Sequence, residues 1–208
     1  MRRSAVFALA LVLLLAGACS SDKKPEANGE DAPPTTADNG LRVFKDAPPW
    51  PLADRQADRI AEAGLPLLTA EGSIVHFHAH LDVFDNGERV TIPAGVGIDF
   101  ERRVISPLHT HFDTGVLHVE AEADEPVTLG QFLMQWGVRV EGDCIGNVCA
   151  PDPIAAYVNG VKQPGPVTEI VIKADLEIAL ILGTPPPTIP KGYTCVNPSD
   201  ACPKTPAP

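Results

Sequence analysis

All six histidines of this 208-residue chain lie between positions 76 and 118. They occur in two short segments, HFHAH and LHTHFDTGVLH. Imidazole is a borderline ligand that suits zinc and copper(II), and coordination needs three or four donors that converge from different directions. The sequence therefore predicts a Zn²⁺ or Cu²⁺ site, in which not every histidine has to bind. The candidate ligands are His76, His78, His80, His109, His111 and His118.

The spacing of the first three histidines predicts a strand over residues 74–84. Apolar residues alternate there with the histidines, and Asp82 continues the polar row. Side chains two apart in a strand point to the same face. A single row does not enclose a metal ion, so further donors have to come from a neighbouring strand or loop. His118 and Glu120 would share a face if VLHVE is a strand.

Two short helices are expected beside several strands. One helix should cover residues 52–63, between Pro51 and Gly64, and the other should begin at Thr128, where Gln131 completes a capping box, and end before Gly137. Turns at Asn86-Gly87 and Asn159-Gly160 predict hairpins. The expected strands, besides 74–84, are 88–92, 116–121, 154–158, a return strand around EIVI at 169–172, and 177–182. This pattern predicts an α+β fold, mainly antiparallel β with two short helices, in which residues 115–183 fit a β-grasp-like C-terminal half.

The N-terminal residues have the order of a signal peptide. Arg2 and Arg3 precede an apolar run over residues 5–15, and small residues lead to Cys19. The run is shorter than the roughly 20 residues of a membrane-spanning helix. Cysteine after a small-residue cleavage site resembles the lipobox of bacterial lipoproteins. We therefore expect cleavage after residue 18 and a lipid such as palmitate on Cys19. The lipid would anchor the protein to the extracytoplasmic face of the cell membrane.

The mature chain is expected to have three parts. Residues 19–47 are polar and Pro-rich and are interpreted as a disordered tether, residues 48–184 as a single globular domain, and residues 185–208 as a Pro-rich tail with a cysteine loop. Outside the cytoplasm close thiols oxidise, which favours two local disulfides. These are Cys144 with Cys149, and Cys195 with Cys202; zinc binding by the four thiolates is the alternative.

The charge of the chain excludes one class of partner. Loss of Arg2 and Arg3 leaves 14 Lys and Arg against 27 Asp and Glu, so the net charge moves from −11 to −13. Such a surface repels the phosphate backbone of nucleic acids and attracts cations. The expected partners are the membrane, through the lipid, and a metal ion.

Several segments resemble a group of uncharacterised exported proteins of actinobacteria. The similar segments are GLPLLTAEGSIVHFHAHLDVFDNGERVTIPAGVGID, SPLHTHFDTGVLHVE, TLGQFLMQWGV and AYVNG. That group carries a similar histidine strand, a Leu-His-Thr-His motif and a Trp-Gly segment, without an established activity. In the group an Asp directly follows His-Thr-His, whereas here Phe112 stands before Asp113. The resemblance implies a coherent exported domain rather than a particular function.

Three functions remain open at this stage. The preferred hypothesis is a non-catalytic extracytoplasmic lipoprotein that handles copper or zinc through its histidine cluster. A zinc-dependent hydrolase or hydratase is the second, with Glu120 or Asp82 as general base. The third is a metal-free envelope interaction scaffold whose histidines are structural or sense pH. No HExxH motif, phosphate loop or nucleophile elbow is present, so we assign no catalytic residue.

Overall fold

The computed structural model describes residues 40–193. The expected signal peptide, the lipid-bearing Cys19 and the cysteine pair of the tail, Cys195 and Cys202, lie outside the described residues. Within the described range, no helix combines the length and apolar character that crossing a membrane requires.

Two short α-helices and twelve strands make up the described part of the chain. In order these are α1 (Gln56–Glu62), β1 (Val75–Asp85), β2 (Glu88–Val90), β3 (Ile98–Asp99), β4 (Val104–Ile105), β5 (Leu108–His109), β6 (Val116–Ala121), α2 (Leu129–Trp136), β7 (Val140–Glu141), β8 (Cys144–Ile145), β9 (Val148–Cys149), β10 (Ile154–Val158), β11 (Val161–Lys162), the 3₁₀ helix η1 (Val167–Glu169) and β12 (Glu177–Leu182).

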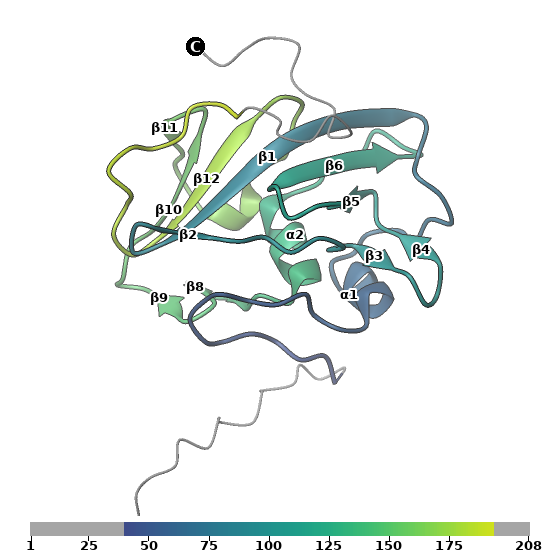
Figure 1. Cartoon of the computed structure of the whole chain (residues 1–208), viewed down its shortest axis with the longest axis horizontal. Helices are drawn as coiled ribbons and strands as arrows, with labels where there is room; N and C mark the ends of the chain where they lie inside the picture. Colours follow the sequence, from purple (N-terminus) through teal and green to yellow (C-terminus); the bar gives the residue numbers. More distant parts are fainter. Residues whose placement is uncertain (1–39, 194–208) are drawn as a thin grey trace, which may run out of the picture. The chain divides into compact units, whose positions relative to one another are not determined.

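A seven-stranded sheet dominates the structure (Figure 1). Its order is β11-β10-β12-β1-β6-β5, and β2 pairs with the end of β1. Strands β1 and β12 are parallel, whereas the other neighbours in the sheet are antiparallel. The α+β class with mainly antiparallel strands is thus confirmed.

The last strands do not form a self-contained half. Strand β1 lies between β6 and β12, so residues 115–183 have no continuous sheet of their own. The series β6-β1-β12-β10-β11, with α2 between β6 and β10 in the chain, has the strand arrangement of a β-grasp. The expected β-grasp-like half is therefore corrected in extent: it includes β1, whose two edges are both paired by later strands.

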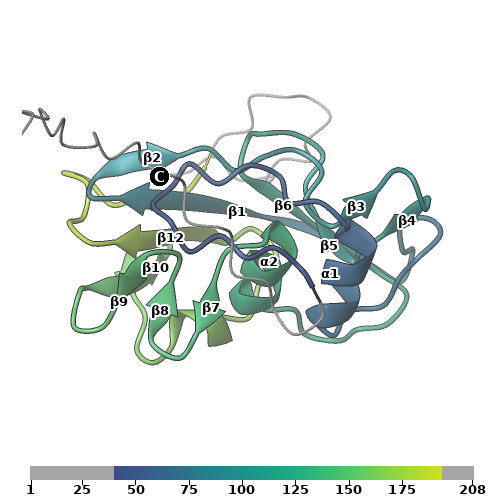
Figure 2. The same ribbon diagram turned by 90° about the horizontal axis from the view of Figure 1, so that it is seen from below.

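The two faces of the sheet differ because β1 alternates apolar and polar residues. Ala79, Leu81 and Val83 are buried in the main core, together with Ile60 of α1 and Phe132 of α2. Both helices lie on this side of the sheet (Figure 2). The predicted capping box of α2 is present, since Thr128 and Gln131 exchange hydrogen bonds there. The histidines of β1 therefore lie on the face away from the helices.

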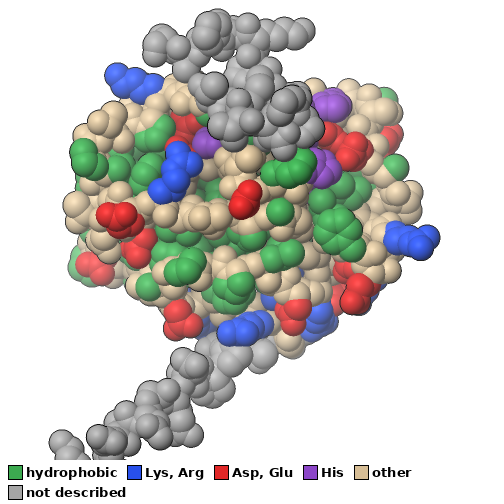
Figure 3. All heavy atoms as spheres, viewed as in Figure 1, with side chains coloured by type: hydrophobic (Ala, Val, Ile, Leu, Met, Phe, Trp, Pro, Cys, Tyr) green, Lys and Arg blue, Asp and Glu red, His purple; other side chains and the backbone are tan. Residues whose placement is uncertain are grey.

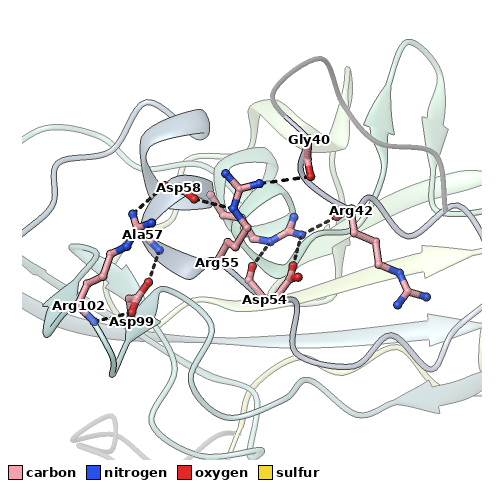
Figure 4. Close-up of polar contacts among 9 residues, drawn as sticks. Gly40, Arg42, Asp54, Arg55, Ala57, Asp58, Asp99 and Arg102 are labelled. Carbon is pink, nitrogen blue, oxygen red and sulfur yellow. Dashed lines mark hydrogen bonds and ion pairs between the residues drawn. The ribbon is translucent and has the colours of Figure 1, made fainter.

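Helix α1 is shorter than the helix expected over residues 52–63. Arg55 has a left-handed φ of 55°, so the helix begins only after it. Asp58 in the first turn accepts hydrogen bonds from Arg55 at 2.7 Å and from Arg102 at 2.8 Å (Figure 4). These contacts attach α1 to the loop that follows β3.

The folded part also begins before residue 48, where the globular domain was expected to start. Leu41 and Phe44 are buried, and Phe44 forms a β-bridge with Val138. The buried Arg59 donates a hydrogen bond of 2.6 Å to the carbonyl of Arg42. The buried side chains of Leu41 and Phe44, with backbone hydrogen bonds from Phe44 to Gly137 and from Arg139 to Phe44, attach this segment to the core.

Both predicted Asn-Gly turns are present, with positive φ at each residue. The first joins β1 to β2, as expected. The second leads directly into β11, which pairs with β10. The prediction of a return strand around residues 169–172 is therefore wrong. That segment contains the end of η1 and a single β-bridge from Val171 to Thr128. In a hairpin with a two-residue turn, the second strand begins immediately after the turn. Pro164 and Pro166 then prevent this strand from continuing.

A second, three-stranded sheet contains the first cysteine pair. Cys144 on β8 and Cys149 on β9 are directly opposite each other and form a disulfide. The expected local pairing is confirmed here. These two sulfurs are therefore not thiolate ligands, which removes the four-thiolate zinc alternative.

Candidate metal centre

Strand register brings together histidines that are far apart in the sequence. His78 on β1 is directly opposite His118 on β6, and His118 is directly opposite His109 on β5. His76 is opposite Glu120 in the same way. Residues directly opposite in antiparallel strands point to the same face. Three adjacent strands thus present one continuous group of imidazoles and a carboxylate on the face away from the helices.

The distances within this group are those of metal ligands. Nε2 of His78 lies 3.0 Å from Nδ1 of His118, which lies 3.2 Å from Oε1 of Glu120. Two nitrogens bound to one tetrahedral zinc ion at its usual bond length are about 3.3 Å apart. These contacts are hydrogen bonds whose lengths are close to the spacing of metal ligands, and His78 and His118 belong to two adjacent groups of candidate ligands that share Glu120.

His109 is held in the tautomer that a ligand needs. Its Nδ1 donates to the carbonyl of Ser106 at 2.9 Å, which leaves the lone pair on Nε2. That Nε2 lies 3.1 Å from Nε2 of His111. Burial, followed by the charge of His111, lowers the pKa of His109 to about 3. The buried imidazole is therefore neutral at physiological pH and its lone pair is free of a proton.

Glu120 is the centre of the group. Its side chain is 3% exposed, and Oε1 lies 3.4 Å from Nε2 of His76 and 3.9 Å from Nε2 of His78. Burial alone would raise the pKa of Glu120, but the hydrogen bond with His118 and the charges of His109 and His76 lower it to about 2. The second oxygen, Oε2, is buried without a hydrogen-bond partner among the described residues. A buried carboxylate with an unsatisfied oxygen favours a bound cation.

The group opens to solvent on one side. A pocket of about 620 Å³ is lined by Glu71, His76, His78, His111, Phe112, His118 and Glu120. His76 and His111 are the most exposed of the histidines there, at 57% and 30%. Glu71 lies at the rim, 3.3 Å from Nε2 of His111. In the space-filling view the histidine side chains lie in the upper part of the molecule, with acidic side chains beside some of them (Figure 3). An ion can therefore reach the buried donors from outside.

His80 belongs to a different group on the same face. Its Nδ1 is 2.9 Å from Oε2 of Glu177 and its Nε2 is 2.9 Å from the carbonyl of Thr114. A carbonyl and an ionised carboxylate only accept hydrogen bonds, so a ring protonated on both nitrogens satisfies both contacts. Although burial lowers the pKa of His80, the hydrogen bond and charge of Glu177 raise it above its usual value. The pKa of Glu177 is raised as well, by burial, so the two groups share protons, and the protonated form of the ring has no lone pair to offer a metal.

The surroundings of His80 form an ionic network with its own contacts. Asp82 lies 3.8 Å from His80 and pairs with Arg89 at 2.6 Å. The ring of Tyr193 stacks on His80 at 4.9 Å. His80, Asp82 and Glu177 are close enough to surround an ion, but two cationic side chains already face the two carboxylates. We therefore leave His80 out of the metal centre.

The structure thus brings together five of the six predicted histidine ligands. The site also uses residues that were not among the predicted ligands. Glu120 could have been included, since it lies two residues after His118 on a predicted strand. Nothing in the sequence pointed to Glu71, which reaches His111 through the folding of a distant loop, or to the carbonyl of Ser106, which lies just before β5.

No known protein family model matches the chain, and searches of curated proteins and of solved structures find no match either. The site itself shows that buried histidine and glutamate groups can hold a metal ion.

Proposed function

We propose that this protein binds Zn²⁺ or Cu²⁺ at the histidine and glutamate group on strands β1, β5 and β6. The observation that carries the proposal is Glu120, a buried and ionised carboxylate surrounded by ring nitrogens at ligand spacing. Its neighbours His78 and His109 are also buried. Such an arrangement is costly without a cation and becomes favourable when one is bound.

The donor atoms select the class of metal. They are imidazole nitrogens and carboxylate oxygens, and no sulfur atom is among them. Imidazole-rich sites suit Zn²⁺ and Cu²⁺, whereas Cu⁺ prefers thiolates and thioethers, and Ca²⁺ and Mg²⁺ prefer oxygens alone. We therefore propose zinc or copper(II) as the ion.

The proposed setting of this activity is the outer side of a cell membrane. The support comes from the basic residues, short apolar run and small residues that precede Cys19. A lipid on that cysteine would keep the protein at the membrane surface while the metal site faces the surrounding solution. Its role would be to bind or pass on a metal ion without catalysing a reaction.

The test is isothermal titration calorimetry of the purified processed protein after treatment with EDTA. The wild type should bind Zn²⁺ or Cu²⁺ stoichiometrically. Glu120→Gln keeps the size of the side chain but removes its charge, and we expect at least about a tenfold loss of affinity. Glu125→Gln makes the same change at an exposed position outside the pocket and serves as the control.

Circular dichroism should show that both variants are folded. Absence of binding to the wild type would overturn the proposal. Equal affinity of the wild type and Glu120→Gln would also overturn it, because the ion would then bind elsewhere.

A further inference from the structure

We propose that the centre holds two metal ions and that the carboxylate of Glu120 bridges them. This inference rests on the proposed function and concerns the composition of the same site. It follows from the way in which the donor atoms are grouped and from the two different environments of the Glu120 oxygens.

The donors fall into two groups that share Glu120. The first contains His109, His111 and His118, and the second contains His76 and His78. Within each group the ligand atoms, including one from Glu120, lie within 4.8 Å of one another. A tetrahedral ion has four ligands about 3.3 Å apart. One ion can therefore bind within one group, but it cannot bind all six side chains.

The two oxygens of Glu120 are distinct. Oε1 lies 3.2 Å from Nδ1 of His118 in the first group, and 3.4 and 3.9 Å from Nε2 of His76 and His78 in the second, so it stands between the two groups. Oε2 is buried and accepts no hydrogen bond within the described part of the chain. A carboxylate that uses one oxygen for each ion would satisfy both atoms, whereas one ion bound through Oε1 would leave Oε2 buried and unsatisfied.

The two groups are adjacent. Nε2 of His78, in one group, is only 3.0 Å from Nδ1 of His118, in the other. Two-metal sites in proteins commonly place their ions about 3.5–4 Å apart. Glu71, 3.3 Å from His111, adds a second carboxylate that offsets the charge of two divalent ions. The second group has only three protein donors, and the exposure of His76 leaves room for water to complete the coordination.

The test uses Cu²⁺, whose unpaired electron reports whether two ions are close. The processed protein is loaded with increasing Cu²⁺, bound copper is measured by mass spectrometry, and spins are counted by electron paramagnetic resonance. We expect two bound ions per chain. The first equivalent should give about one spin per copper. The second should lower the spins per copper at least about twofold, because bridged ions are magnetically coupled.

His76→Ala is the discriminating variant, because this exposed side chain contributes only to the second group. It should bind one Cu²⁺ with a full spin count, while Glu125→Gln should bind two with the reduced count. One ion in the wild type, or two in His76→Ala, would overturn the two-ion inference and leave the proposed function intact. Two ions with full spin count would overturn the bridge. Absence of any binding would overturn both proposals.

Discussion

At the scale of single residues, the role of each histidine follows from what its second nitrogen contacts. His109 and His80 are both buried and both donate from Nδ1 to an oxygen. In His109 the other nitrogen faces His111, whereas in His80 it faces the carbonyl of Thr114. A lone pair therefore remains on His109, whereas both nitrogens of His80 are engaged by oxygens. The same residue type is thus a candidate metal ligand in one place and an ionic partner in another.

The buried neutral state of His109 should make the metal-free protein sensitive to acid. Its pKa is about 3 in the folded protein, against 6.5 for an unperturbed histidine. Below pH 6.5 the unfolded chain takes up a proton that the folded protein does not, so stability falls as the pH falls. From pH 6 to pH 5 the loss in the free energy of unfolding attributable to His109 should be about 1 kcal/mol.

Urea unfolding in the presence of EDTA measures this effect. The His109→Asn variant keeps a donor toward Ser106 but takes up no proton, so its loss of stability between pH 6 and pH 5 should be smaller by that amount. The lowered pKa of Glu120 adds to acid sensitivity only below about pH 4.5, outside this window. An equal pH dependence in both proteins would contradict the assignment.

At the scale of elements, the position of the short strand β5 depends on the loop before it. The backbone N–H of Ser106 donates to the carbonyl of Gly97 at 2.8 Å, and Gly97 has a φ of 78°. A Cβ at Gly97 would lie 2.6 Å from the carbonyl oxygen of Leu108 and 3.1 Å from Cβ of His109. The lack of a side chain here allows β5 to place His109 beside β6.

The substitution Gly97→Ala should therefore destabilise the fold and weaken metal binding. We expect a loss of roughly 2–4 kcal/mol in the free energy of unfolding, from the left-handed backbone and the clash together. Gly165→Ala is the matched control, because Gly165 has a φ of 80° but open space around its Cβ position. It should lose only about 1–2 kcal/mol and keep its metal affinity.

Urea unfolding and zinc titration of both variants measure the two quantities. If Gly97→Ala had the same affinity for zinc as Gly165→Ala, the position of β5 would not control the site.

At the scale of the whole molecule, the two faces of the sheet differ in composition. The face toward α1 and α2 forms the core, and the opposite face carries the donors. The donors come from three strands that meet only in the folded state, so the ion should bind the folded protein and not the unfolded chain. Metal binding and folding are then thermodynamically linked.

Zinc should consequently raise the thermal midpoint of unfolding. At a free zinc concentration of about 100 times the dissociation constant, the gain is roughly 2.7 kcal/mol, which corresponds to about 5–10 °C for a domain of this size. Calorimetry with zinc and then with excess EDTA should show the rise and its reversal. The Glu120→Gln variant should show little rise, and an equal rise in that variant would indicate non-specific binding.

A double variant, Cys144→Ser with Cys149→Ser, separates stability from binding. Loss of this short-loop disulfide should lower the free energy of unfolding by about 2 kcal/mol. The zinc-induced rise should remain, because β8 and β9 supply no donor. Loss of the rise would mean that the second sheet supports the metal centre.

The local features of this protein could be predicted from its sequence. Alternation in β1 separated a histidine face from a core face, the Asn-Gly pairs gave the turns, and Thr128 with Gln131 marked the start of α2. The pairing of Cys144 with Cys149 was predictable as well, because the two are close in the chain. Each of these features depends on neighbours within a few residues, whose geometry the sequence determines directly.

The tertiary structure alone decided which donors meet. The register of β1, β6 and β5 placed His78 beside His118 and His109, made Glu120 their common neighbour, and placed His80 opposite Glu177. It also placed β1 at the centre of the sheet, where residues 115–183 alone had been expected to form a β-grasp-like half. Register between distant strands is set by the packing of the whole core, and one-residue shifts exchange the two faces of a strand. No local pattern in the sequence carries that information.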